Sequence, residues 1–214
     1  MQFPNALEGV KKIYKAEILD LISAVLVLLA GILALVGLGA GSGGAVLGGG
    51  FVAIAAAVLG IIAFILNLIG LNKAKLDEAG FKNALTVVIV GIVASILLGA
   101  TKEGTFLNGL GDVVSEICKF LVTFFVCTGV YNLAQKLNDS AMSEKAMKTR
   151  KMVMATWIVG IALSLVGNII ETVGNSSGLT TVAGVLGLVS AIAQIVSYIM
   201  YLGMLKRATV ALQA

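Results

Sequence analysis

The stretch from 18 to 39, ILDLISAVLVLLAGILALVGLG, decides the fold class, because 22 residues carry a single charged side chain, Asp20. A helix of about 20 apolar residues crosses the roughly 30 Å hydrocarbon core of a bilayer. Although a basic segment precedes it, as in a secretory signal peptide, the run exceeds the ~7 to 15 residues of a cleaved segment. We therefore expect the chain to retain it as a transmembrane helix.

Five further stretches have the same apolar character. Together with the first, they cover residues 18–39, 50–71, 84–100, 113–134, 152–170 and 179–205. The chain has 59% apolar and 12% charged residues, whereas soluble domains carry about 25% charged residues. The prediction is an all-α integral membrane bundle of six helices with short loops, forming one domain over 18–214 that contacts the lipid bilayer. Since no basic stripe with interleaved aromatics is present, nucleic-acid binding is not expected.

Residues 1–17 form a predicted N-terminal interfacial segment. Phe3, Leu7, Val10 and Tyr14 recur at helical spacing, and the lysines of this segment fall largely elsewhere on the helix. This pattern is typical of an amphipathic helix at the membrane surface, which we favour, although the segment could also be the first turns of the first spanning helix. The glycine-rich residues 40–50 are expected to form a short external turn.

The positive charges collect in alternate gaps between the stretches. The termini and the second and fourth gaps hold 13 Lys and Arg residues, the other gaps hold one, and Lys119 lies within a stretch. Because short cytoplasmic loops retain Lys and Arg, both termini are predicted to be cytoplasmic. We expect a multi-pass protein of the plasma (inner) membrane of a bacterium. The fourth stretch is the weakest, with Glu116 and Lys119 expected to pair at its outer end.

Small residues recur with a spacing that favours close helix packing. The sequence from Ile89 to Ile92 reappears 69 residues later, and Gly91 with Ser95 corresponds to Gly160 with Ser164. The match indicates duplicated hairpins or a chance similarity between apolar helices. Gly187 begins another such pair in the last stretch. These residues are predicted to let helices approach closely, with hinges as the alternative.

Polar residues inside predicted spans are the candidate functional residues. Gln194 lies near the middle of the last span, and Ser164 at comparable depth is a candidate partner. Asn168 and Glu171 lie one turn apart at the outer end of the fifth span. All four could line a solute path, and the alternative is that they bind neighbouring helices or water.

Polar residues near the cytoplasmic ends receive structural interpretations. Glu17 and Asp20 are expected to complement the dipole at the start of the first spanning helix. Asn67 and Asn132 are expected to bind water or loop backbone.

The sequence offers no catalytic or metal-binding pattern. Histidine is absent, and Cys118 and Cys127 are nine residues apart on one predicted helix, about 13 Å at the helical rise, which is too far for a disulfide between them. No intramembrane carboxylate pair suggests acid–base chemistry. We therefore expect no enzyme, no cofactor and no metal.

Three functions remain open. The number of spans resembles that of the substrate-binding membrane subunits of bacterial vitamin uptake systems, a likeness of architecture without a shared motif. The chain could be a small-solute carrier or its membrane subunit, with an unidentified substrate near Gln194. It could instead be a non-transporting scaffold or assembly partner, or an oligomeric channel with Glu116 or Glu171 at its mouth. We favour the carrier, and a homo-oligomer or a partner membrane protein is compatible with each function.

Overall fold

The computed structural model describes the backbone of residues 2–39, 43–99, 106–173 and 177–213, and the side chains of residues 2–37, 47–97, 114–160 and 192–213. This part of the chain is all-α and contains no strand. Its helices are α1 (Pro4–Gly39), α2 (Gly43–Ala74), α3 (Ala79–Gly99), α4 (Phe106–Lys136), α5 (Ser140–Val173) and α6 (Ser177–Ala211).

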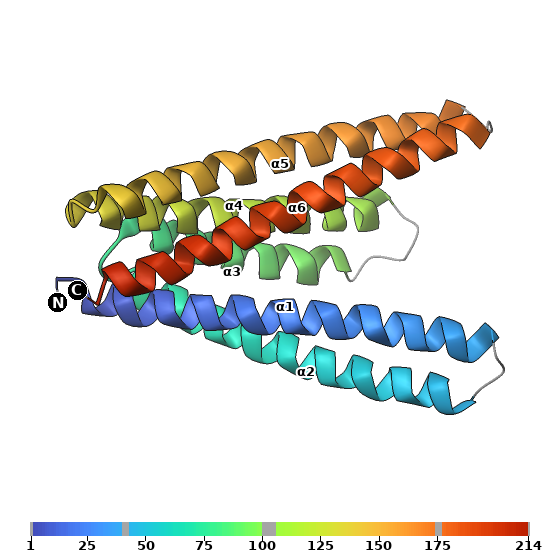
Figure 1. Ribbon diagram of the computed structural model, residues 1–214, viewed down its shortest axis with the longest axis horizontal. Coiled ribbons are helices and arrows are strands. Elements are labelled where there is room, and N and C mark those ends of the chain that lie inside the picture. The colour runs from blue at the N-terminus through green and yellow to red at the C-terminus, as the bar shows by residue number, and fades with distance from the viewer. Residues whose placement is uncertain (1, 40–42, 100–105, 174–176, 214) are drawn as a thin grey trace.

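The helices form three hairpins that point the same way. Figure 1 shows α1–α2, α3–α4 and α5–α6 side by side, with both chain termini and the α2–α3 and α4–α5 turns at one end of the bundle. We call this the terminal end and the opposite one the hairpin end. The 13 alternating cations of the sequence belong to the segments at the terminal end.

The six helices are arranged as a ring in chain order. Each helix contacts the next one along the chain, and α1 contacts α6, which closes the ring. α1 and α4 therefore occupy opposite positions in this order. α4 also touches α6 across the ring.

An apolar core fills the ring at the terminal end. Every helix contributes to it, and its fully buried large side chains come from α1, α2, α3, α4, α5 and α6. Among them are Val10, Ile13, Leu71, Phe81, Val126, Leu133, Met142, Met204 and Leu205. These side chains fill the space between the six helices at this end. This end of the bundle is closed.

Two glycines bring α1 and α2 into backbone contact. A Cβ atom on Gly9 would lie 2.5 Å from the carbonyl oxygen of Gly70, and one on Gly70 would lie 2.8 Å from the carbonyl oxygen of Gly9. No side chain fits between these backbones. Close approach of this kind is how helices associate in lipid, where apolar burial between helices gains little.

The turn between α4 and α5 is fixed by two residues. Asn138 has a φ of 55°, and the amide N–H of Asp139 donates to the carbonyl of Ala134 at 3.0 Å, as in a Schellman helix end. Asp139 then caps α5 by accepting from the Met142 N–H at 2.9 Å. Its other oxygen accepts from Arg207 at 3.3 Å, which ties α6 to this turn.

Four of the helices are long and apolar enough to cross a membrane: α1, α2, α3 and α4, within the part of the chain whose side chains are described. Large apolar side chains cover their outer surfaces, for example Leu28 (69% exposed) and Phe51 (74% exposed). A surface of this kind is typical of contact with lipid rather than water. The apolar helices suggest a membrane-embedded protein.

The helices extend beyond the predicted spans. Residues 4–17 are the first turns of α1 and not a separate surface helix, because Leu7, Val10 and Ile13 pack into the core as α1 continues without a break. Most of the glycine-rich turn predicted at 40–50 is helical, since α2 begins at Gly43. The charged segment after Asp139 is the start of α5.

Candidate functional site

The face of α1 that lines the ring changes character along its length. Ala6, Ile13 and Asp20 are seven residues apart, so they lie on one face of the helix. Ala6 and Ile13 are fully buried in the core, whereas the side chain of Asp20 is exposed. This face is therefore apolar and buried at Ala6 and Ile13 and polar and exposed at Asp20.

Two other helices show the same change at the same spacing. On α4, Leu133 and Val126 are fully buried, and Lys119, seven residues farther along the same face, is exposed. On α6, Ala208 and Tyr201 are buried, and Gln194 is exposed. We call Asp20, Lys119 and Gln194 the inner-face residues.

The inner-face residues lie at a common depth. Tyr198 of α6 contacts Glu17 of α1, so the two helices are level there, and Asp20 and Gln194 lie three and four residues farther from the terminal end, about 4.5 and 6 Å. Lys136 of α4 lies over the ring of Phe3, 5.8 Å from its centroid, so α4 is level there with the start of α1. Lys119 and Asp20 are each 17 residues farther from the terminal end, about 26 Å along their helices.

The two charges among these residues are not neutralised by a protein partner. No ion pair or side-chain hydrogen bond joins Asp20 or Lys119 to another residue in the described part of the chain. The predicted pairing of Glu116 with Lys119 is absent there too. Both residues lie well inside α4, which begins at Phe106, and not at its outer end.

A polar cluster forms the floor beneath the inner-face residues. The hydroxyl of Tyr198 lies 2.7 Å from the backbone carbonyl of Glu17 and 3.0 Å from its carboxylate. Asn67 of α2 donates to the same carboxylate at 3.3 Å, while its own buried Oδ1 has no partner among the described residues. We call Glu17, Asn67 and Tyr198 the floor cluster, and it joins α1, α2 and α6.

The floor cluster corrects two interpretations of the sequence. Glu17 cannot complement a helix N-terminus, because α1 begins at Pro4 and Glu17 lies more than three turns inside it. Asn67 binds the Glu17 side chain rather than loop backbone.

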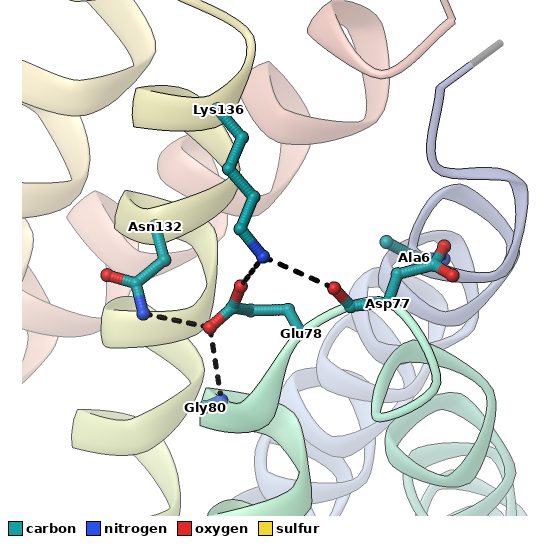
Figure 2. Close-up of polar contacts among 6 residues, drawn as sticks. All are labelled: Ala6, Asp77, Glu78, Gly80, Asn132 and Lys136. Carbon is teal, nitrogen blue, oxygen red and sulfur yellow. Dashed lines mark hydrogen bonds and ion pairs between the residues drawn. The ribbon is translucent and has the colours of Figure 1, made fainter.

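A second polar cluster fastens the terminal end from outside the core, as Figure 2 shows. Asp77, in the turn between α2 and α3, accepts from the Ala6 N–H at 2.7 Å and from the Asn5 side chain at 3.1 Å. It thereby satisfies the Ala6 amide in the first turn of α1, which has no partner within the helix. Pro4 has no amide N–H and therefore needs no acceptor. We call Asp77, Glu78, Asn132 and Lys136 the turn cluster.

Glu78 connects this turn to α4. It precedes α3, and its buried carboxylate (the residue is 6% exposed) forms an ion pair with Lys136 and accepts from Asn132 at 2.8 Å. Burial alone would raise the pKa of Glu78, but the hydrogen bonds from Lys136 and Asn132 outweigh burial and hold the pKa below its usual range. Asn132 therefore binds a carboxylate rather than loop backbone.

The structure describes the side chains of some, but not all, of the site residues predicted from the sequence. The side chain of Gln194 is exposed, and it lies seven residues from the buried Tyr201 on α6. Four other candidates lie outside the residues whose side chains are described. They are Ser164, the suggested partner of Gln194, the outer polar pair Asn168 and Glu171, and the packing residue Gly187. No contact between Gln194 and Ser164 is therefore described.

The predicted packing residues also differ from one another. A Cβ atom on Gly91 would lie 3.2 Å from the Cβ of Cys118, so this glycine lies against α4. Ser95 is exposed, and a Cβ atom on Gly160 would meet no atom within 4 Å. Gly91 and Gly160, which the 69-residue similarity equates, therefore occupy unlike environments.

Sequence reasoning missed Asp20, Lys119, Glu17 and Tyr198 as site residues. The signal that could have found the first two is the spacing of seven to buried apolar residues. That signal depends on knowing which face is buried, and this requires the ring.

The described residues contain no group of three His, Cys, Asp or Glu side chains that could hold a metal ion. The two cysteines are free thiols. Comparison with protein-family models, curated proteins and solved structures finds no match for this chain.

Proposed function

We propose that the protein crosses a bacterial inner membrane six times with both termini in the cytoplasm, and that it is a small-solute carrier or the membrane subunit of one. The apolar surfaces of α1 to α4 support the membrane location. The cations gathered at the terminal end favour a cytoplasmic position for that end.

One observation carries the carrier proposal: the inner faces of α1, α4 and α6 become polar and exposed at a common depth. Charged groups in the membrane-crossing part of a bundle are costly, and they mark substrate or ion pathways. Carriers bind their substrates near the middle of the bilayer. The inner-face residues match this arrangement, with a sealed cytoplasmic side and an accessible outer side.

The closed core bears on a pore through one subunit. Such a pore needs a continuous path, whereas apolar side chains from all six helices block the ring at the terminal end. A scaffold needs no polar inner face, so Asp20 and Lys119 would destabilise it without a return in function. A carrier accounts for both features, because it is closed on one side in each state.

Substituted cysteines test the proposal directly. In a variant without native cysteines, we expect Asp20→Cys, Lys119→Cys and Gln194→Cys to react with a membrane-impermeant thiol reagent applied from outside. Matched controls are Ile22→Cys, Ile117→Cys and Ile192→Cys, each two residues away and about 200° around its helix. These exposed isoleucines face lipid in the proposal and should not react.

Access from the other side distinguishes a carrier from a static cavity. In inside-out vesicles the three inner-face cysteines should also react, more slowly, since a carrier visits an inward-open state. Reaction from outside alone would contradict transport. Equal reactivity of the inner-face and control cysteines would contradict the polar interior.

A further inference from the structure

We propose that the inner-face residues bind a small zwitterion whose ammonium group faces Asp20 and whose carboxylate faces Lys119. This inference rests on the proposed carrier function and names its substrate class. The ligand belongs to the chemical class of free amino acids and related molecules that carry one positive and one negative group.

The argument begins with the positions of the two charges. Asp20 belongs to α1 and Lys119 to α4, which are three steps apart in the ring in either direction. Their side chains lie at a common depth on faces that line the ring. Within the described residues α1 and α4 do not contact each other, and both side chains are exposed. This separation leaves room for a small molecule between the two side chains.

The energetics favour a ligand with both charges. Neither Asp20 nor Lys119 has an ion-pair partner in the described residues, so each charge is available to an oppositely charged group on a ligand. A cation would neutralise Asp20 and leave Lys119 unpaired, and an anion would do the reverse. A zwitterion satisfies both groups with charge-assisted hydrogen bonds.

Gln194 adds orientation to this recognition. It lies on the neighbouring helix α6, four residues from Tyr198, whereas Asp20 lies three residues from Glu17, the contact partner of Tyr198. Gln194 is therefore about one residue farther from the terminal end than Asp20. Its amide is polar but uncharged, so it adds no third charge beside Asp20 and Lys119.

The floor cluster closes the site on the cytoplasmic side. The contacts of Tyr198 with Glu17 join α6 to α1 directly beneath the inner-face residues. For a bound solute to leave toward the terminal end, α6 must separate from α1 at this point. Tyr198 thus acts as a positioning residue for the closed state.

The test uses the full chain in lipid nanodiscs and three matched probe mixtures: the proteinogenic amino acids, their N-acetyl derivatives (anions) and their methyl esters (cations). We expect the amino-acid mixture to raise the unfolding temperature, because ligands that bind only the folded state stabilise it. The derivative mixtures should give no comparable shift at equal concentration.

Variants assign the effect to the two charges. Asp20→Asn and Lys119→Gln should each weaken binding of the amino-acid mixture more than about tenfold, since each leaves one ligand charge unpaired. Asp20→Glu keeps the charge and should retain binding, which guards against a folding defect. Glu144→Gln and Lys82→Gln, at exposed positions far from the ring interior, should bind as the unaltered protein does.

The outcomes separate this inference from the proposed function. A shift with either derivative mixture but not with amino acids, or no shift with any mixture, overturns the zwitterion site even if the cysteines react from both sides. Zwitterion binding without cysteine access from the cytoplasmic side leaves the binding site intact and overturns transport.

Discussion

At the scale of single residues, the partners of an acidic side chain decide its contribution to stability. Glu78 is buried and held by Lys136 and Asn132, whereas the side chain of Glu144 is 67% exposed and pairs with Lys148 on the same helix. The exposed pair lowers the pKa of Glu144 through Lys148 but competes with water. We expect only the Glu78 pair to affect stability measurably.

Lys136→Met should therefore destabilise the protein by about 1–3 kcal/mol at neutral pH, because it leaves a buried carboxylate short of a donor. The lowered pKa of Glu78 means that its contribution is present above the ordinary value of about 4.3 and is lost as the pH falls through the folded-state value. The difference between variant and unaltered protein should shrink below about pH 4.

Unfolding temperatures in detergent between pH 3 and 8 measure this difference. Lys148→Met is the matched control, since it breaks an exposed pair, and should leave the unfolding temperature unchanged. A Lys136→Met variant that unfolds like the unaltered protein at pH 7 would contradict the role assigned to the turn cluster.

At the scale of helices, close packing depends on where glycines fall relative to neighbours. Gly9 and Gly70 meet backbone to backbone, and neither stood out in the sequence. Gly160 did stand out, yet it faces open space. A small-residue pattern identifies helices that can approach closely, and the partner helix decides which glycine is used.

Gly9→Ala should destabilise the protein by about 1–3 kcal/mol, as overpacking does in a filled core. The added methyl group would lie 2.5 Å from the carbonyl oxygen of Gly70 and 2.6 Å from the backbone nitrogen of Ala74, and backbone cannot move aside as a side chain can. Gly160→Ala should be neutral or mildly stabilising, because alanine favours the helix and meets nothing. The unfolding temperatures of both variants test this contrast, and equal effects would contradict it.

The helices were largely foreseeable from the sequence, and their ends were not. Long apolar runs predict helices because only a helix satisfies its own backbone in lipid. The predicted spans are 17 to 27 residues long, but α1 has 36 residues and α5 has 34. The extra turns carry charges and stand outside the apolar runs. An apolar run ends at the first charged residue, whereas the helix continues until a turn such as Asn138–Asp139 ends it.

The candidate site was foreseeable only in part for a related reason. Gln194 stood out as a polar residue in an apolar run. Asp20 and Lys119 were assigned to helix ends, because single charges near the edge of a run usually lie there. Placing them inside the ring required the contacts of Tyr198 with Glu17, which join residues 181 positions apart.

At the scale of the whole molecule, the arrangement of the six helices gives the protein two unlike ends. The terminal end is packed, capped and basic, and the hairpin end is joined to it by helices with apolar outer surfaces. Figure 1 shows both termini on the same side, which agrees with an even number of crossings. The charge distribution then predicts the orientation.

Single cysteines introduced as Ser140→Cys and Ser176→Cys should label from opposite sides of the membrane in a background without native cysteines. An impermeant maleimide applied to intact cells should modify position 176 and should reach position 140 only after lysis. Labelling of both positions in intact cells, or of neither, would contradict six crossings with cytoplasmic termini.

The cap that Asp77 places on the start of α1 has a consequence for biosynthesis. The Ala6 amide waits for a partner that lies 71 residues later in the chain, a delay of roughly 4 to 14 seconds at ribosomal speeds of about 5–20 residues per second. Until the turn between α2 and α3 has been translated, the first turn of α1 lacks this partner, while Lys11, Lys12 and Lys15 are already present to meet anionic headgroups. In the proposed orientation, these lysines can therefore set the threading direction before the cap on α1 has emerged.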